Sequence, residues 1–377
     1  MKILNVNTSL DPVNGGGTAE RTFQMSRFLA KAGADCAVLV TDLGLTPERL
    51  KKLQNVEVVA YPCLSRRFYI PKGSYKDIWN LVANAEIIHL MNHWSFLNAL
   101  VFLMARDLHK PYVVCPAGAL PIYGRSKILK RFYNLVIGRN IIRQAHGQIA
   151  IAPVEISQFK AYGVPPEKIS IMPNGVDAGN FLSNDTVAFR EKFGLGDAPF
   201  ILFMGRLNAI KGPDLLLQAF CNISDTIRNY HLVFAGPDGG MLSQLKEMAA
   251  TRNISDRVHF TGYLGGADKS QAYYAAELLV VPSRQEAMSI VVLEAGVTGT
   301  PVLITDQCGF DDVIHIGGGQ VVPVTAGGLQ AGLNELLREP DGLKAMGERL
   351  KHYVSSHFTW DIIARKYLEY YALFVRK

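Results

Sequence analysis

The segment ELLVVPSRQEAMSIVVLEAGVTGTPVLIT (Glu277–Thr305) reads as a strand, a loop, a helix and a second strand, in that order. Its two apolar runs, ELLVV and PVLIT, are short and rich in β-branched or aliphatic residues, which is typical of buried strands. Ser289 is a favourable N-cap for the intervening helix IVVLEAGVTG. Because strands joined through a helix pair in parallel, the segment predicts a parallel sheet with helices on its faces.

Short apolar runs of the same kind recur along the chain, separated by amphipathic stretches such as TAERTFQMSRFLAKAG. This alternation predicts an α/β protein with two doubly wound sheets. Proline, asparagine and glycine cluster at IMPNGVD (171–177), which marks the expected domain boundary. The expected strands are KILNVN, CAVLVT, VEVVA, EIIHL, PYVVC and QIAIA in the first half, and PFILFM, HLVFA, RVHF, ELLVV, PVLIT and QVV in the second.

Between Pro282 and Val302 the segment holds two carboxylates, Glu286 and Glu294, in a largely apolar stretch. On a continuous helix they would lie about 80° apart, so a shared helical face does not explain them. With Ser289 as N-cap, both flank a helix N-terminus, which suits a phosphate. Hydroxyl groups on either side of a phosphate would account for both carboxylates, and a nucleoside diphosphate sugar has that layout. The other interpretation is that Glu294 complements the helix dipole and Glu286 is solvated.

Length and composition favour a folded two-domain protein. The chain has 377 residues, of which 49% are hydrophobic and 19% charged. No apolar run reaches the roughly 18 residues of a membrane-spanning helix. The start, MKILNVN, reads as a strand and not as a signal peptide, and the five cysteines form no C-x-x-C pair. We therefore expect a cytoplasmic protein with reduced thiols and no zinc site.

Positive charge is concentrated in the first half of the chain. Residues 1–175 contain 21 Lys and Arg against 11 Asp and Glu, a net charge of +10, whereas the remainder contains 18 and 22, a net charge of −4. This asymmetry predicts a negatively charged partner for the first half. The alternative is that these charges only solvate the surface.

Two segments of the first half, 65–76 and 123–145, mix basic residues with aromatic or aliphatic ones. No nucleic-acid recognition motif accompanies them, so nucleic acid is not the expected partner. An anionic membrane surface fits better, because basic residues attract acidic lipids while apolar side chains enter the interface. The competing interpretation is that one face of 123–145 packs into the core. The basic residues are Arg66, Arg67, Lys72 and Lys76 in the first segment, and Arg125, Lys127, Lys130, Arg131, Arg139 and Arg143 in the second.

Loops that follow the expected strands carry further candidates, because ligands of open α/β sheets bind at such loops. The first strand is followed by a glycine loop, Gly15–Gly17, that opens a helix at Thr18. The loop lacks the G-x-G-x-x-G pattern, and turn chemistry explains the glycines about as well. Arg206 and Lys211 bracket the loop after the first strand of the second half, where they could hold a diphosphate or form an exposed surface pair.

Together, these segments resemble the GT-B-fold glycosyltransferases of family 4 (glycosyl transferases group 1), which are retaining and use nucleotide-sugar donors. The resemblance covers nearly the whole chain, from the glycine loop through PNGVD, GRLNAIKG, FTGYL and PSRQEAMSIVVLEA to FTWDIIARKYLEYY. The E-x7-E pair in register with an upstream G-R-x-x-x-x-K-G is specific, whereas either alone is not. The resemblance implies two Rossmann-like domains facing across a cleft. Residues 1–172 with a C-terminal helix at 361–377 form the acceptor side, and residues 173–360 bind the donor.

The resemblance also assigns the residues that contact the donor phosphates. Arg206 and Lys211 are expected to hold the diphosphate and to assist its departure. Gly16 and Gly17 are expected to approach the phosphates from the other domain. Backbone N–H groups of the loop and helix start complete the set, at Met288, Ser289 and Ile290.

The remaining implied roles concern the two ends of the donor. Glu294 is expected to bind the ribose hydroxyls, Glu286 the transferred sugar in a catalytic role, and backbone near Tyr263 the base. The donor is a UDP- or GDP-linked sugar, and no separate cofactor is implied. No Asp-x-Asp follows a strand, and Asp311–Asp312 reads as a helix start, so metal-independent hexosyl transfer is expected. The implied acceptor is a glycan or lipid-linked glycan in cell-surface polysaccharide or glycoconjugate synthesis, reached from the inner face of the membrane.

The chain departs from the family pattern at two positions. Ser289 stands where a glycine is common, and Ala117 stands where many relatives have a histidine that touches the donor sugar. Neither His89 nor His93 can simply replace that histidine, because a lone histidine is more often structural than catalytic. Two alternatives therefore remain: a non-catalytic subunit that binds sugar nucleotides or glycans, and an NAD-dependent dehydrogenase that uses Asp42 for a ribose.

Overall fold

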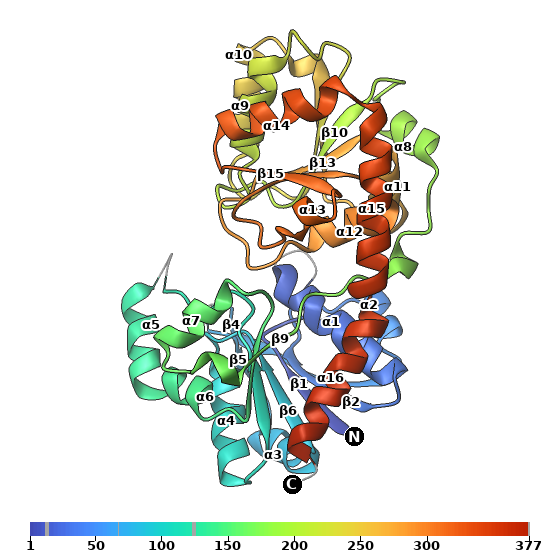
Figure 1. Cartoon of the computed structure of the whole chain (residues 1–377). Coiled ribbons are helices and arrows are strands. Elements are labelled where there is room, and N and C mark those ends of the chain that lie inside the picture. Colours follow the sequence, from blue (N-terminus) through green and yellow to red (C-terminus); the bar gives the residue numbers. More distant parts are fainter. Residues whose placement is uncertain (12–14, 67, 123–125, 376–377) are drawn as a thin grey trace. The chain divides into compact units, whose positions relative to one another are not determined.

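The computed structural model describes residues 1–11, 15–66, 68–122 and 126–375 (Figure 1). The chain forms two compact units. Unit 1 comprises Met1–Gly175 and Trp360–Lys377, and unit 2 comprises Val176–Thr359. The first division thus falls after Gly175, where the sequence predicted 172, and the second falls before Trp360.

Unit 1 is built on a parallel sheet with the strand order β3-β2-β1-β6-β7-β8-β9. Alternate residues of its central strands face opposite layers. Leu4 and Ile88 belong to the apolar core that also contains residues of α3 and α4, whereas Asn5 and His89 contact α1 and α16. The strands are β1 (Lys2–Val6), β2 (Asp35–Thr41), β3 (Val56–Tyr61), β6 (Ile87–Met91), β7 (Tyr112–Cys115), β8 (Gly147–Ala150) and β9 (Ile169–Ile171).

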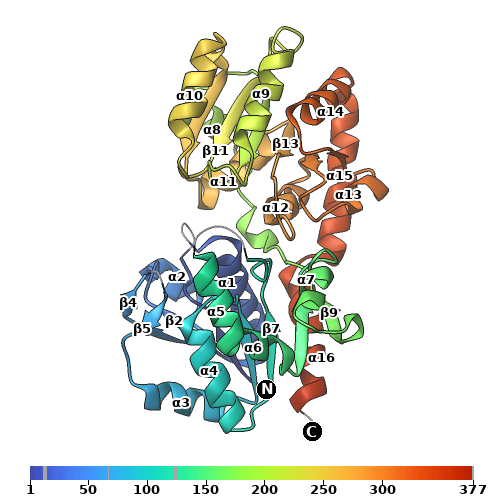
Figure 2. The same cartoon turned by 90° about the vertical axis from the view of Figure 1, so that its left-hand side faces the viewer.

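The helices of unit 1 form a layer on each face of this sheet (Figure 2). A small antiparallel pair, β4 (Cys63–Ser65) and β5 (Ile70–Pro71), lies outside it. A π-helical turn, η1 (Asn134–Gly138), joins α5 to α6. The helices are α1 (Gly16–Lys31), α2 (Pro47–Lys52), α3 (Tyr75–Asn84), α4 (Phe96–Asp107), α5 (Lys127–Tyr133), α6 (Arg139–Arg143), α7 (Glu155–Ala161) and α16 (Trp360–Val375).

Unit 2 repeats the arrangement on a parallel sheet with the order β12-β11-β10-β13-β14-β15. One apolar core lies between this sheet and the helices α9, α10 and α14, while α8, α11, α12 and α15 contact one another. The strands are β10 (Phe200–Met204), β11 (His231–Ala235), β12 (Val258–Gly262), β13 (Leu278–Val281), β14 (Val302–Thr305) and β15 (Gly319–Val322). The helices are α8 (Thr186–Lys192), α9 (Pro213–Ile223), α10 (Leu242–Thr251), α11 (Gly266–Ala275), α12 (Ile290–Thr298), α13 (Asp312–His315), α14 (Ala326–Arg338) and α15 (Asp341–His357).

The predicted fold class of two doubly wound α/β sheets is confirmed, and every strand expected from the sequence is present. The sequence missed β9 and the β4–β5 pair, which are short and only partly buried, so no long apolar run marks them. Helix α1 begins at Gly16 instead of Thr18. Asp312 does begin a helix, α13, as the sequence indicated. None of the described helices is long and apolar enough to cross a membrane.

The strand order identifies where a ligand is expected in each unit. In both sheets the order reverses beside the first strand of the unit, between β1 and β6 and between β10 and β13. Open α/β sheets bind ligands at such a reversal, beyond the carboxyl ends of the strands. In unit 2 the loops at this place are those that follow β10 and β13.

Candidate functional site

The loop after β10 carries both cations that the sequence singled out. Arg206 and Lys211 lie at its two ends, and the Lys211 backbone N–H donates to Asn208 Oδ1 at 3.0 Å. The side-chain stem of Arg206 lies against Gly239, where a Cβ would come within 2.8 Å of the Arg206 Cγ. The start of the loop therefore needs a glycine in the neighbouring β11–α10 connection.

The loops after β10 and β13 are tied together as one rigid group. Gly212 has a φ of +67°, and a Cβ there would lie 2.1 Å from the Pro282 carbonyl oxygen, so only glycine fits. Arg284 donates to both carboxylate oxygens of Asp214, at 2.9 and 2.6 Å. Its backbone N–H also donates to the Ile210 carbonyl oxygen at 2.7 Å. The sequence reasoning missed this bidentate pair, which fixes the two loops in register.

Glu286 and Lys211 form an ion pair in the structure. Lys211 Nζ lies 2.8 Å from Glu286 Oε1, and Ser283 Oγ donates to the same oxygen at 2.5 Å. The Glu286 side chain is only 9% exposed, whereas that of Lys211 is 34% exposed. From the sequence these two residues were expected to have separate roles, and their direct contact was not predicted. It places a partly open ammonium group beside the carboxylate that was predicted to meet the sugar.

Ser289 is the N-cap residue of α12, as predicted, but its side chain does not cap the helix. Its Oγ is buried and has no hydrogen-bond partner among the described residues. The Ser289 backbone N–H donates to the Cys308 carbonyl oxygen at 3.1 Å, which removes one of the N–H groups predicted for phosphate. Gly309, at a φ of +64°, allows this approach because a Cβ there would lie 2.0 Å from the Ala287 carbonyl oxygen.

The N-termini of α10 and α12 differ in how they are closed. At α10, Asp238 accepts hydrogen bonds from the backbone N–H groups of Gly240, Met241 and Leu242, and these bonds lower its pKa. A carboxylate of the protein thus already occupies the anion position at that helix. At α12 the side chain of the N-cap residue, Ser289, makes no such bond. Of these two helix ends, the α12 end is therefore the one suited to an external anion.

Glu294 lies in a second, separate polar cluster. Lys269 Nζ lies 2.5 Å from its Oε1, and Tyr273 OH donates to its Oε2 at 2.7 Å. Burial and the neighbouring carboxylate raise the pKa of Tyr273, so its hydroxyl stays a donor. The sequence reasoning missed both partners, although their i, i+4 spacing in an expected helix would have placed them on one face.

The other predicted contact positions lie at carboxyl ends of strands as well. Tyr263, which is 53% exposed, follows β12. Gly16, at the start of α1, has a φ of +63°, and a Cβ there would meet no atom of the described residues beyond its own helix within 4 Å. Gly17 follows it in the first turn of the same helix.

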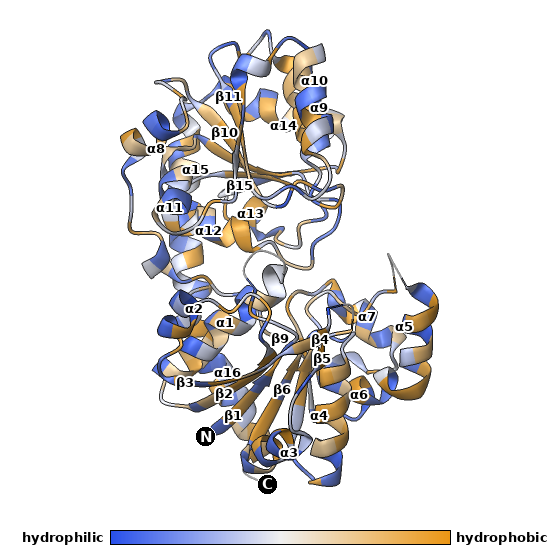
Figure 3. Ribbon diagram, turned by 180° about the vertical axis from the view of Figure 1, so that it is seen from behind, coloured by the Kyte–Doolittle hydropathy of each residue, from blue (hydrophilic) through white to orange (hydrophobic). Residues whose placement is uncertain are grey.

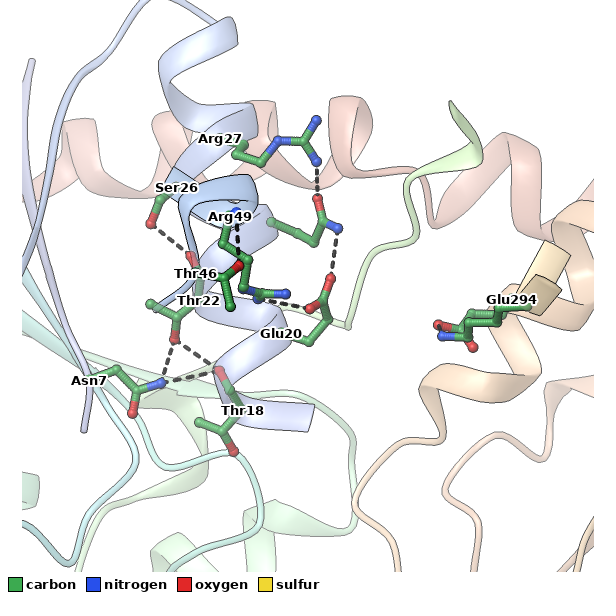
Figure 4. A network of polar contacts seen from close by, with 11 residues as sticks. Asn7, Thr18, Glu20, Thr22, Ser26, Arg27, Thr46, Arg49 and Glu294 are labelled. Carbon is green, nitrogen blue, oxygen red and sulfur yellow. Dashed lines mark hydrogen bonds and ion pairs between the residues drawn. The ribbon is translucent and has the colours of Figure 1, made fainter. Parts of the chain in front are cut away.

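A polar network fixes the beginning of α1 (Figure 4). Asn7 follows β1, and its Nδ2 donates to the Thr18 carbonyl oxygen at 3.2 Å and to Thr22 Oγ1 at 2.8 Å. On the outer side of the helix, Arg49 donates to Glu20 at 3.0 Å. These bonds hold the glycine-rich start of α1 at the end of the first strand.

The polar candidates of unit 1 are engaged in structural contacts. His89 is fully buried, and its Nδ1 bonds to Tyr371 OH at 2.5 Å. His93 is buried and bonds through Nε2 to Asn134 Oδ1 at 3.0 Å. Burial lowers the pKa of His89 to about 3 and that of His93 to about 4, so both are neutral. The two histidines therefore have structural roles in the interior of unit 1.

Asp42 and Ala117 also belong to the local architecture. Asp42 Oδ1 accepts the Cys63 backbone N–H at 3.1 Å, which ties the end of β2 to β4 and gives the carboxylate a structural role. Ala117 has a φ of +50°, a left-handed conformation, in the loop after β7. The buried Glu155, which the sequence reasoning missed, holds this loop by accepting the N–H groups of Gly118 and Ile151.

Comparison with known proteins gives two family matches and several relatives. The family described as Glycosyltransferase Family 4 matches residues 15–180, and the family described as Glycosyl transferases group 1 matches residues 185–353. A D-inositol 3-phosphate glycosyltransferase of Nocardia farcinica is 33% identical over 245 residues, which are 62% of this chain and 54% of that protein. The chain thus spans about half the length of the curated relatives it matches.

Solved structures share the fold over the whole chain. HepE of Anabaena, in complex with UDP and glucose, has a TM-score of 0.79 at 17% identity, with 99% of each chain covered. A sucrose-phosphate synthase from Thermosynechococcus elongatus has a TM-score of 0.76 at 19% identity, with 100% of each chain covered. At such identity the likeness establishes the fold alone.

Proposed function

The chain belongs to the GT-B-fold glycosyltransferases of family 4, and from that premise we propose that it transfers a hexose-type sugar from a nucleoside diphosphate sugar, with retention of configuration. One observation carries this proposal. Arg206 and Lys211 lie in the loop after β10 and the N-terminus of α12 follows β13, the two strands between which the strand order of unit 2 reverses, and Glu286 pairs with Lys211. Cations and helix N–H groups suit a diphosphate, while a carboxylate beside them suits sugar hydroxyls.

The proposed reaction depends on stabilising a leaving group. The bond between the anomeric carbon and the diphosphate oxygen breaks, the acceptor oxygen bonds to that carbon, and the acceptor proton is released. Negative charge then develops on the diphosphate, where Arg206 and Lys211 would neutralise it without reorganisation. Tight packing of their loop against the loop after β13 keeps both cations in position.

Glu294 is proposed to bind the ribose of the donor. Lys269 and Tyr273 hold its carboxylate by one oxygen each, so its orientation is set before a ligand arrives. Each carboxylate oxygen has two lone pairs, which leaves capacity for ribose hydroxyls. The donor is proposed to be UDP- or GDP-linked. The HepE structure that shares this fold was solved with UDP, which supports a nucleotide of this class.

The acceptor is proposed to be a glycan or lipid-linked glycan used in cell-surface polysaccharide or glycoconjugate synthesis. The net charge of +10 in residues 1–175 supports an acceptor or carrier with negative charge. The matched relatives named D-inositol 3-phosphate glycosyltransferases have, by their name, a phosphorylated acceptor, which fits the same charge. The protein is proposed to act in the cytoplasm, peripherally at the inner face of the membrane.

A ligand screen followed by a product assay tests the proposal. UDP, GDP, ADP and their sugar conjugates are compared by thermal shift, because a ligand at 100 times its dissociation constant stabilises the fold by about 2.7 kcal/mol. The preferred conjugate is then incubated with the protein, and release of nucleoside diphosphate is measured. Release with an acceptor supports the transferase, whereas binding without any turnover would favour a sugar-nucleotide-binding subunit.

A further inference from the structure

The helix that runs from α5 through η1 to α6 exposes an apolar ridge on its outer side. The ridge consists of Ile128, Phe132, Leu135 and Val136, whose exposed fractions are 82%, 61%, 81% and 57%. Their spacing of four, seven and eight residues places them on one side of a helix. Orange bands of high hydropathy mark α5 at the edge of unit 1 (Figure 3). A ridge of four large exposed apolar residues is unusual for a surface in water alone.

The opposite side of the same helix is anchored in the core of unit 1. Tyr133 OH donates to the carbonyl oxygens of His93 and Ser95 at 3.0 and 3.1 Å. Asn134 bonds to His93 Nε2 at 3.0 Å and donates to Tyr162 OH at 2.7 Å. One face of this part of segment 123–145 therefore packs into the core, as the competing interpretation expected, while the other face is exposed. Since these bonds fix the rotation of the helix, the ridge cannot turn inward.

Basic residues accompany the ridge along its own helix. Lys127, Arg131 and Arg139 are exposed on the same helix. The sequence contains no acidic residue between Asp107 and Glu155, so nothing in this stretch offsets them. Arg125 and Arg67, which also belong to the predicted basic segments, lie outside the described residues.

We propose that this ridge enters the headgroup region of an anionic bilayer while Lys127, Arg131 and Arg139 contact acidic lipid headgroups. The proposal rests on the proposed function in one respect, since a lipid-linked acceptor gives docking its purpose. Apolar side chains ringed by lysine and arginine are the pattern of helices that lie in the membrane interface. Each basic residue near an anionic surface strengthens binding about fivefold. A second protein would satisfy the apolar ridge, but it would not require a helix whose charged residues are all basic.

Vesicle sedimentation tests the docking. The whole protein is mixed with vesicles of phosphatidylcholine alone or with added phosphatidylglycerol, at low and high salt. Wild-type protein should sediment with the phosphatidylglycerol vesicles at low salt and less at high salt. The triple variant Ile128→Ser, Phe132→Ser, Leu135→Ser should bind at least about tenfold more weakly, because it loses the apolar insertion. Reversing Lys127→Glu and Arg131→Glu should weaken binding by more than about tenfold as well.

Two control variants separate the ridge from general surface effects. Leu373→Ser removes an apolar residue that is 63% exposed on α16, and it should bind vesicles like wild type. Lys51→Glu with Lys52→Glu makes the same charge change on α2, and it should weaken binding less than the change on α5. Equal loss from both charge pairs, or unchanged binding of the triple serine variant, would overturn the proposal.

Two further readouts identify what failed if the result is negative. Thermal stabilisation by nucleotide is measured on the same samples, and the ridge variants should retain it. If wild-type protein does not bind vesicles but is still stabilised by nucleotide, only the membrane docking is overturned. If wild-type protein shows neither effect, the proposed function is overturned as well. Sedimentation velocity without vesicles tests whether the ridge instead binds a second copy of the chain. A wild-type dimer that the triple serine variant converts to a monomer would assign the ridge to self-association and overturn the membrane proposal.

Discussion

The sheets of the two units share a strand-order reversal, but the polar residues on and around their strands have different roles. In unit 1, Asp42, His89, His93 and Glu155 are committed to holding loops and helices, and three of the four are buried. Their hydrogen-bond partners are backbone groups, one tyrosine and one asparagine of the same unit. These groups are therefore part of the support of the fold.

Unit 2 carries two lysine–glutamate pairs that reach the surface. Lys211 pairs with Glu286 and Lys269 with Glu294, and the lysine side chains are 34% and 28% exposed. A pair that is open on one side can exchange part of its contact for a ligand, whereas a buried group cannot without loss of stability. The comparison indicates that the polar residues of unit 1 support its fold, whereas the two lysine–glutamate pairs of unit 2 are open to a ligand.

The largest expected effect is a loss of stability at low pH, which should be greater in unit 1 than in unit 2. His89 and His93 titrate near 6.5 in the unfolded chain, but burial lowers their pKa values to about 3 and about 4. Below pH 6.5 the unfolded chain binds protons that the folded chain refuses, so stability falls as pH falls. Between pH 7 and pH 5, each histidine should lower the free energy of unfolding by about 2 kcal/mol. The protection factors of β1 and β6 amides, which correct for the slower intrinsic exchange at pH 5, should fall accordingly.

Unit 2 gives the internal reference for this experiment. Burial also lowers the pKa values of His231 and His259, but both are only partly buried, so β10 and β13 should lose less protection. His89→Gln with His93→Gln should flatten the pH dependence of unit 1. His352→Gln, which changes an exposed histidine, should leave it unchanged. Equal acid sensitivity in the two units would contradict the contrast.

The next effect concerns the phosphate contacts of unit 2. Arg206→Ala and Lys211→Ala should each weaken nucleoside diphosphate binding by roughly 1.5–3 kcal/mol, because each removes a charge-assisted contact. Calorimetric titration measures the loss. Arg228→Ala is the matched control, because it removes an 81% exposed cation of the same unit. Wild-type affinity in both loop variants would contradict the assignment of Arg206 and Lys211 to the donor phosphates.

The sequence predicted the architecture better than the site, for a physical reason. Strands such as Leu278–Val281 are unbroken apolar runs that stay visible without tertiary context. The two predicted glutamates occupy the expected loop and helix, because an N-cap and a proline mark those boundaries. The pairing of Lys211 with Glu286, by contrast, joins residues that are distant in the chain. It depends on Gly212 packing under Pro282, and no local pattern encodes such a contact.

A smaller effect should follow from loosening Glu294 without removing it. Tyr273→Phe deletes one hydrogen bond to the carboxylate and should weaken nucleotide binding by about 1 kcal/mol. Tyr274→Phe is the matched control, because its hydroxyl bonds to the Phe181 carbonyl oxygen instead. Titration of both variants with the same nucleotide makes the comparison. A larger loss in the control would show that Tyr273 does not position Glu294.

The smallest expected effect is that of chelation. Under the proposed function Arg206 and Lys211 would supply fixed positive charge for the leaving diphosphate, so turnover should survive EDTA unchanged. The assay measures nucleoside diphosphate release before and after treatment with the chelator. Complete loss that manganese restores would contradict a metal-independent reaction and would move the phosphate chemistry away from these two residues.

The central claim is that the two glutamate clusters of unit 2 serve opposite ends of one donor. The most direct test titrates Glu286→Gln and Glu294→Gln with a nucleoside diphosphate and with its sugar conjugate. Glu294→Gln should weaken the binding of both ligands by the same factor, because the ribose is present in each. Glu286→Gln should leave the affinity for the free diphosphate nearly intact and lower turnover of the conjugate. The reverse pattern, or equal losses in all four titrations, would contradict the account.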